Sequence, residues 1–405
     1  MVNVAILGFG TIGSGVFTVL DQNREVVTKN VGEEVRVKYV LDLREFPGQP
    51  VEKVLVHDIK DIIEDPEVDI VVETMGGLHP AYDFTKAALE AGKNACTSNK
   101  AVVAEFGTEL MQVAKANNCS YLFEASCGGG IPIIRNIHSC LTADVIDEVS
   151  GILNGTTNYI LTQMTDNGLD YATALKQAQD LGYAERNPEA DVEGHDAQRK
   201  ISILSALAYG QFIDYTDVPT EGISKISAED IEYAKAMGRK IKLLGYSQKT
   251  EAGVCAMVSP IMIKPAHPLY SVDDVFNAIF VHGNMLGDAM FYGSGAGSLQ
   301  TASAVCADIV ELAKNRHNGV MNIWKAEKTE LLPMDHVENK FFVRVGGVPA
   351  EKQAEAEKAF GPVELVEVPE IAGEFAVITG MMTEAAFKAA AEKVQDVRSV
   401  IRVKD

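Results

Sequence analysis

The sequence lacks the features that mark several classes of protein. No apolar run approaches the roughly 18–20 residues that a membrane-spanning helix needs. Basic residues are few, since 36 Lys and Arg face 57 Asp and Glu, and the formal charge of −21 repels phosphate backbones. Hydrophobic residues still make up 47% of the 405 residues, which is enough to form cores for more than one domain. We therefore expect a globular protein that binds neither nucleic acid nor a membrane.

The six cysteines form no Cys-x-x-Cys pair and are spread along the chain. In a chain of this length we expect six reduced thiols, most of them packed as small apolar groups. The apolar run Val2–Leu7 passes directly into a glycine-rich turn, which leaves no removable leader. The cytoplasm is the compartment that these features predict.

Short apolar runs alternate with helical patterns over the first part of the chain. This order predicts a Rossmann-type α/β domain at residues 1–135, a parallel sheet with helices on both faces. The expected strands are Val2–Leu7, Val35–Leu41, Val68–Val72, Ala95–Thr97 and Tyr121–Phe123, and the expected helices are Thr11–Leu20, Ala81–Ala91 and Phe106–Asn117.

The pattern changes after residue 135. Longer helical segments predict an α+β domain for substrate binding and dimerisation at residues 136–323, and within it the helix Thr301–Asn315 returns to the first domain. Its other expected helices are Tyr171–Leu181, Ala197–Tyr209 and Ala228–Leu244. A polar linker is expected at residues 324–339, and residues 340–405 follow the βαββαβ order of a ferredoxin-like module.

The hexapeptide Gly8-Phe9-Gly10-Thr11-Ile12-Gly13 fits G-x-G-x-x-G between a strand and a helix. Gly8 would allow the tight turn, Gly10 would let a pyrophosphate approach the backbone, and Gly13 would let the helix pack on the strand. Phosphates would then lie on the free amides of Thr11, Ile12 and Gly13 at the helix N-terminus. A glycine-rich turn that serves only packing is the alternative.

The second expected strand ends at Asp42, and Arg44 lies two residues further on. An acid at this position accepts the ribose hydroxyls of NAD, whereas an arginine pairs with the 2′-phosphate of NADP. Because both residues are present, the sequence leaves the choice between NAD and NADP open.

Acidic residues gather in the segment Ala178–Lys200, which reads AQDLGYAERNPEADVEGHDAQRK. Asp196 and Lys200 are four residues apart on the helix that follows, so they share one face. The pair could be a surface ion pair worth about 0.3–0.5 kcal/mol. It could also serve an alcohol dehydrogenase, in which a lysine removes the hydroxyl proton as hydride leaves carbon. His195, beside the cluster, is expected in a loop.

Several segments together resemble the homoserine dehydrogenase family over roughly residues 1–320. The most specific is Ala178–Lys200, which follows the family signature throughout. The other segments are Glu73–Gly77, Thr97–Ala101, Glu124–Ile134 and Gly151–Leu161. The tail, residues 340–405, is similar to an ACT domain, a module that senses small molecules.

The resemblance implies NAD(P)-dependent interconversion of L-homoserine and L-aspartate 4-semialdehyde, a step in threonine, methionine and isoleucine biosynthesis. Lys200 would exchange the proton with the substrate oxygen and Asp196 would hydrogen-bond homoserine. Lys100 would be a second cation near the nicotinamide, which favours the neutral amine at Lys200. The other substrate-binding positions implied are Glu185 for the α-ammonium, Asp191 in support, and Tyr183, Gly155 and Thr156.

The resemblance also implies ligands of the cofactor and of an ion. The further cofactor positions are Met75, Gly76, Lys100, Gly182 and Gly297. A Na⁺ or K⁺ ion would be held by Glu124 and the backbone carbonyls of Cys127, Gly129 and Ile131. Gln300 departs from the family, which usually has proline there. The tail implies a homodimer or homotetramer and threonine as the effector.

Two other functions compete with this assignment. One is a different NAD(P)-dependent sugar or semialdehyde oxidoreductase, which activity with another aldehyde would select. The other is a sensor protein without enzymatic activity, in which the pair Asp196 and Lys200 would be idle.

Overall fold

The computed structural model describes residues 1–316, 318–320 and 324–405. The chain divides into two compact units. The first unit consists of residues 1–145, 202–214 and 291–329, and the second of residues 146–201, 215–290 and 330–405. The domain boundary expected at residue 323 lies outside the described residues.

The first unit is built on a six-stranded sheet in the order β3-β2-β1-β4-β5-β6. Every neighbouring pair in it is parallel, which confirms the Rossmann-type sheet. Its strands are β1 (Val2–Leu7), β2 (Val35–Leu41), β3 (Leu55–Val56), β4 (Ile70–Glu73), β5 (Asn94–Thr97) and β6 (Tyr121–Leu122). All six residues of β1 are buried, as expected for a central strand with both faces covered.

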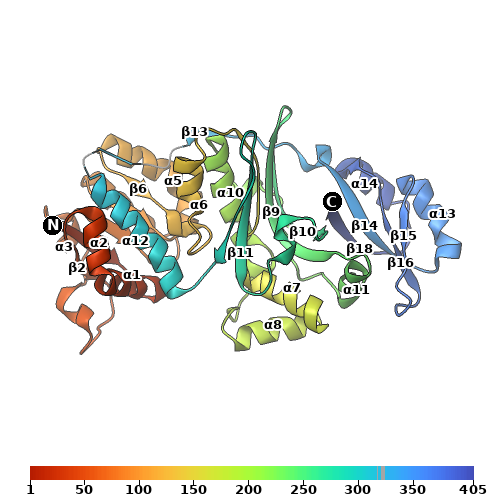
Figure 1. The fold of residues 1–405 in the computed structure, drawn as a ribbon, viewed down its shortest axis with the longest axis horizontal. Helices are drawn as coiled ribbons and strands as arrows, with labels where there is room; N and C mark the ends of the chain where they lie inside the picture. The colour runs from red at the N-terminus through yellow and green to blue at the C-terminus, as the bar shows by residue number, and fades with distance from the viewer. Residues whose placement is uncertain (317, 321–323) are drawn as a thin grey trace. The chain divides into compact units, whose positions relative to one another are not determined.

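Helices surround this sheet. They are α1 (Thr11–Gln22), α2 (Arg24–Val31), α3 (Lys60–Ile63), α4 (Ala81–Glu90), α5 (Lys100–Ala116), α6 (Ile133–Arg135) and α12 (Ser298–Lys314). Figure 1 shows α12 beside α1 and α2, although it comes from a distant part of the sequence. Apolar side chains of α12, among them Val305 and Ile309, join the core formed by β1 and α1. The unit also holds the small parallel pair β8 (Gln211–Phe212) and β13 (Lys325–Lys328).

The second unit contains a long mixed sheet in the order β12-β11-β7-β9-β10-β18-β14-β16-β15. Its strands are β7 (Ile146–Ile152), β9 (Lys240–Thr250), β10 (Gly253–Ile263), β11 (Phe276–Gly283), β12 (Gly287–Ser294), β14 (Glu338–Gly346), β15 (Glu364–Val366), β16 (Glu374–Ile378), β17 (Met382–Thr383) and β18 (Val397–Lys404). The tail joins the rest of this sheet through β18, where Arg402–Lys404 pair in parallel with Ile261–Ile263 of β10.

The helices of this unit include α7 (Gly155–Asn167), α8 (Tyr171–Asp180), α9 (Glu189–Val192), α11 (Ala228–Ala236), α13 (Pro349–Phe360) and α14 (Glu384–Ala391), and the chain passes between the units within α10 (His195–Tyr209). The helix expected at Ala228–Leu244 is wrong in its second half. Gly238 has a φ of +65°, which ends the helical path, and residues from Lys240 pair as β9 with β10.

The tail strands lie in the order β18-β14-β16-β15, and each neighbouring pair is antiparallel. Alternate side chains of β14, such as Phe341 and Val343, form a core with Phe360 of α13 and Phe387 of α14. Both helices therefore cover the same face of the tail strands.

Among the described residues, no helix is long and apolar enough to cross a membrane. All six cysteines are free thiols, and only Cys140 is exposed.

Candidate active site

The glycine turn after β1 has the geometry that a dinucleotide requires. Gly8 has a φ of +91°, which an L side chain rarely adopts. A Cβ at Gly13 would lie 1.9 Å from the Gly8 carbonyl oxygen, so only glycine lets α1 approach the turn. A Cβ at Gly10 would meet nothing within 4 Å, so its backbone is open to an approaching group. Each glycine therefore meets the need expected of its position, and the residues fit a dinucleotide.

The N-terminus of α1 faces the same turn. Gly10 is the N-cap residue and brings no side chain to the first amides of the helix. The amides of Thr11 and Ile12 are thus available to a phosphate, which the helix dipole also favours. Ser298 of α12 donates a hydrogen bond to the Thr11 carbonyl at 2.6 Å, and this contact ties the return helix to the turn. Gly297 precedes it as the N-cap of α12, with a φ of +121°.

Asp42 lies at the end of β2 and belongs to the turn through its side chain. Its Oδ2 accepts the Phe9 amide at 2.8 Å, while Nε of Arg44 donates to Oδ1 at 2.9 Å and an Nη group of Arg44 donates to Oδ2 at 2.8 Å. The Arg44 guanidinium holds the pKa of Asp42 well below its usual range. Arg44 itself is exposed, so it can still meet a phosphate from solvent.

A pocket of about 460 Å³ lies against these two residues. It is lined by Gly8, Leu41, Asp42, Leu43, Arg44, His57, Ile59, Met75, Pro80 and Phe84. The lining is mostly apolar and includes the charged pair Asp42 and Arg44, as suits a flat base with a ribose beside it.

The segments Glu73–Gly77 and Thr97–Ala101 meet at the carboxyl ends of β4 and β5. Glu73 accepts the Met75 amide at 2.6 Å and the Thr97 hydroxyl at 2.5 Å. Burial raises the pKa of Glu73 to about 7. Asn99 caps α5 by accepting the amides of Ala101 and Val102, so Lys100 begins the helix and is half-buried. Gly76 is exposed beside Met75 on the same loop.

In the second unit, Lys200 and Asp196 form a buried ion pair on α10. Nζ of Lys200 donates to Asp196 Oδ2 at 2.7 Å and to the Leu153 carbonyl at 2.7 Å. Only 8% of Lys200 and 4% of Asp196 are exposed. The surface ion pair that the sequence left open is therefore wrong, because both groups are shielded from water.

A third side chain holds this pair in place. Nδ2 of Asn154 donates to Asp196 Oδ2 at 2.9 Å and to Asp191 Oδ1 at 2.8 Å. The sequence brought Asp191 and Asp196 into one cluster but assigned no role to Asn154. One feature of the sequence points to Asn154. It lies directly before Gly155-Thr156, at a position where Asn is also a favoured helix cap.

The remaining substrate positions lie around α7 and α8. The Thr156 hydroxyl donates to the Tyr183 carbonyl at 2.5 Å, which ties α7 to the loop after α8. A Cβ at Gly155 would lie 2.7 Å from the Val275 carbonyl oxygen, so this position requires glycine. Glu185 and Gly182 are exposed in the same loop. His195 does not lie in a loop. It is the first residue of α10, which begins two residues before the expected start at Ala197.

Glu124 is 2% exposed, and both of its carboxylate oxygens accept backbone amides, from Ile134 at 2.9 Å and Arg135 at 2.8 Å. Burial raises the pKa of Glu124. The neighbouring Asp308 accepts the Glu124 amide at 2.8 Å and pairs with Arg135. The loop from Cys127 to Ile131 turns through Gly128 and Gly129, both at positive φ. Within the described residues, no group of three or more His, Cys, Asp or Glu could hold a metal ion.

Comparison with known proteins places these features in one family. A family model described as homoserine dehydrogenase matches residues 132–310, and one described as homoserine dehydrogenase, NAD binding domain, matches residues 8–124. The chain is 37% identical to the homoserine dehydrogenase of Bacillus subtilis, over 100% of this chain and 97% of that protein.

Solved structures agree with the sequence comparison. A homoserine dehydrogenase from Thiobacillus denitrificans superimposes with a TM-score of 0.92 at 36% identity, covering 100% of this chain and 98% of that chain. A hyperthermophilic archaeal homoserine dehydrogenase in complex with NADPH gives a TM-score of 0.65 at 27% identity, covering 76% of this chain and 97% of that chain.

Proposed function

Because this chain belongs to the homoserine dehydrogenase family, we propose that Lys200 is the residue that carries the proton when it interconverts L-homoserine and L-aspartate 4-semialdehyde. The observation that carries the proposal is the buried contact of Lys200 with Asp196 and the Leu153 carbonyl. A buried lysine held by defined acceptors keeps one orientation, which proton transfer requires.

The chemistry divides between two groups. The nicotinamide cofactor supplies or accepts the hydride at the substrate carbon. In the direction of reduction, the ammonium of Lys200 gives a proton to the aldehyde oxygen as the new C–H bond forms. In the direction of oxidation, the neutral amine of Lys200 takes the hydroxyl proton. Asp196 orients the amine, and we assign it a hydrogen bond to homoserine as well.

We propose that the substrate amine binds among carboxylates. Glu185 is exposed on the loop after α8, where its carboxylate is accessible to a cationic α-ammonium group. Asp191 supports the site through its bond to Asn154, and Tyr183 and Thr156 fix the loop on which Glu185 lies. We also assign Lys100, at the start of α5, a catalytic role.

The cofactor is NAD or NADP. Gly8, Gly10 and Gly13 would accommodate the pyrophosphate, with the amides of Thr11 and Ile12 as donors. Further positions that we assign to the cofactor are Asp42, Arg44, Met75, Gly76, Lys100, Gly182 and Gly297.

Initial rates with L-homoserine, measured with NAD and with NADP through the absorbance of the reduced nicotinamide, test the function. We expect turnover with at least one cofactor and production of aspartate semialdehyde. Turnover with another alcohol but none with homoserine would overturn the proposal and select the alternative oxidoreductase.

We also propose a Na⁺ or K⁺ site at Glu124 with the backbone carbonyls of Cys127, Gly129 and Ile131. The support is the buried carboxylate of Glu124, because a cation would favour its charged form. Titrating K⁺ into protein dialysed against a tetramethylammonium salt should raise the unfolding temperature of the wild type but not of Glu124→Gln. An equal rise in the unfolding temperature of both proteins would show that the ion does not bind at Glu124.

We propose a homodimer or homotetramer. The strands β12 and β15 are the two edges of the long sheet, and edges carry backbone groups that can pair with another chain. Met290 on β12 is 45% exposed, which adds apolar surface to one edge. Light scattering that reports a monomer at assay concentration would contradict this assignment.

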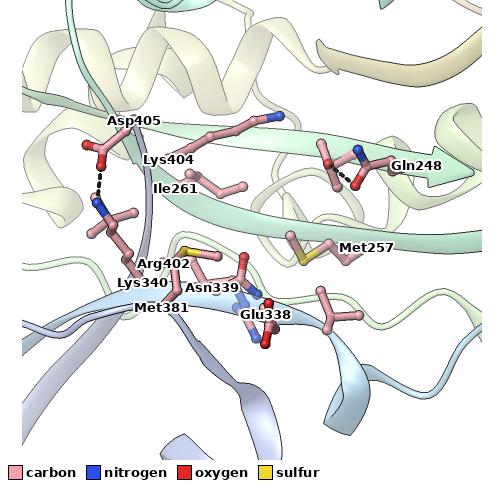
Figure 2. Close-up of a pocket in the computed structure, with 13 residues that line it drawn as sticks. Gln248, Met257, Ile261, Glu338, Asn339, Lys340, Met381, Arg402, Lys404 and Asp405 are labelled. Carbon is pink, nitrogen blue, oxygen red and sulfur yellow. Dashed lines mark hydrogen bonds and ion pairs between the residues drawn. The ribbon is translucent and has the colours of Figure 1, made fainter. Parts of the chain in front are cut away.

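We propose that the tail is an ACT-like module that binds threonine. A pocket of about 440 Å³ lies where the tail strands meet β9 and β10, and Figure 2 shows Met257 and Ile261 on one side of it and Asn339 and Met381 on the other. Lys404 lines the pocket and donates to Glu148 of β7 at 2.7 Å. Leu153 directly follows β7, and its carbonyl accepts a hydrogen bond from Lys200. A ligand that shifts Lys404 would therefore shift the strand that leads to the acceptor of the proton carrier.

Filling the pocket with Met381→Trp tests this site, since Met381 is 58% exposed at its mouth. We expect the variant to keep its rate without threonine and to lose the response to threonine. A response equal to that of the wild type would show that threonine acts elsewhere.

A further inference from the structure

The amide of Asn154 is held at both ends. Its Oδ1 accepts the Thr157 amide at 2.9 Å, as the N-cap of α7. Since only the oxygen can accept that N–H, the NH₂ group must face the other way. The orientation of the side chain follows from the backbone of its own helix.

The NH₂ group of Asn154 lies between two carboxylates. One hydrogen is directed to Asp191 Oδ1 at 2.8 Å and the other to Asp196 Oδ2 at 2.9 Å. The same Asp196 oxygen accepts Nζ of Lys200 at 2.7 Å. Asn154 is only 6% exposed, so these bonds act in a medium of low dielectric constant.

We propose that Asn154 is a positioning residue for the proton carrier, an inference that rests on the proposed role of Lys200. Its two donors bridge the carboxylates of Asp191 and Asp196 and fix the position of the Asp196 oxygen that accepts Nζ of Lys200. Residue 153 contributes the second acceptor through its carbonyl, so two consecutive residues set the direction of the Lys200 amine.

A cap alone does not require asparagine. Ser, Thr and Asp cap helices about as well, because each offers an oxygen to the amide at the third helical position. Asparagine is the cap that also donates two hydrogen bonds from the other end of the same group. Its choice at residue 154 is therefore explained by the carboxylates and not by the helix.

The test compares two variants that keep the cap. Asn154→Asp retains the acceptor for Thr157 but replaces the donors with a third carboxylate. We expect kcat to fall on the order of 100-fold, as for a misplaced catalytic group, while the KM for the cofactor stays unchanged. The added negative charge favours the ammonium of Lys200, so the rising limb of the pH profile for homoserine oxidation should move to higher pH.

Asn154→Ser removes the donors without adding a charge. It should lower kcat and leave the position of the limb unchanged, and it keeps the inference testable if Asn154→Asp does not fold. The matched control is Asp170→Asn, the reverse exchange of the same two residue types at the N-cap of α8, where Asp170 accepts the Thr173 amide at 2.7 Å. This control should keep the wild-type kcat and pH profile.

Wild-type kcat and pH profile in folded Asn154→Asp would overturn the inference and leave Asn154 as a cap only. The proposed function is tested separately, because Lys200→Ala must be inactive for it to hold. An inactive Lys200→Ala together with a fully active Asn154→Asp would therefore refute the positioning role alone.

Discussion

Breaking the ion pair between Asp196 and Lys200 should destabilise the protein far more than breaking an exposed pair of the same spacing. At 2.7 Å, the direct attraction amounts to about 6 kcal/mol at an effective dielectric constant of about 20. Burial offsets part of it, yet Asp196→Ala leaves the ammonium of Lys200 in a site that is only 8% exposed. We expect a loss of about 3–5 kcal/mol in the free energy of unfolding.

A double-mutant cycle isolates the pair. Asp196→Ala, Lys200→Met and the double variant are unfolded in urea and followed by circular dichroism. The double variant should cost at least about 2 kcal/mol less than the sum of the single variants, because it leaves no charge unpaired. The control is Lys176 with Asp180, also four residues apart but with side chains 66% and 62% exposed, where the coupling should stay near 0.3–0.5 kcal/mol. Equal coupling energies in the two pairs would show that burial does not strengthen the pair between Asp196 and Lys200.

Two further predictions concern the first unit. Arg44→Ala should raise the KM for NADPH about tenfold relative to that for NADH, because it removes a phosphate donor and frees Asp42 to accept ribose hydroxyls. An unchanged ratio of the two KM values would remove Arg44 from cofactor selection. Burial raises the pKa of Glu73 from 4.5 to about 7. Between these two pH values the folded protein keeps a proton on Glu73 that the unfolded chain releases. The free energy of unfolding therefore falls as the pH rises from 4.5 to about 7. The fall should be about 3 kcal/mol in the wild type and absent in Glu73→Gln, and equal pH dependence of urea unfolding in both would contradict the assignment.

The parallel sheet of the first unit could be predicted because its strands are short apolar runs bounded by turns. The ends of the helices could not be predicted as well as the strands. The helix expected from Phe106 begins at Lys100, since Asn99 supplies a cap that the apolar pattern does not report. The helix expected to reach Leu244 ends at Ala236, because β9 forms through pairing with β10, a contact between segments that a helical pattern cannot show.

The candidate site could also be predicted only in part. The spacing of Asp196 and Lys200 placed them on one helix face, but spacing alone could not say whether the pair is buried. Burial depends on β7 and α7, which bring the Leu153 carbonyl and the Asn154 amide onto the pair from a segment more than forty residues earlier. The role of Asn154 could not be predicted, because a capping asparagine and an asparagine that orients carboxylates look alike in sequence.

The role of Lys200 as the proton carrier is decided by the variant Lys200→Ala. The measurement is the single-turnover rate of reduced nicotinamide oxidation with aspartate semialdehyde, alongside the affinity for the reduced cofactor by fluorescence. We expect that the variant still binds the cofactor while the rate falls by at least about a hundredfold, the low end of general acid catalysis. A variant that binds the cofactor and turns over at the wild-type rate would contradict it.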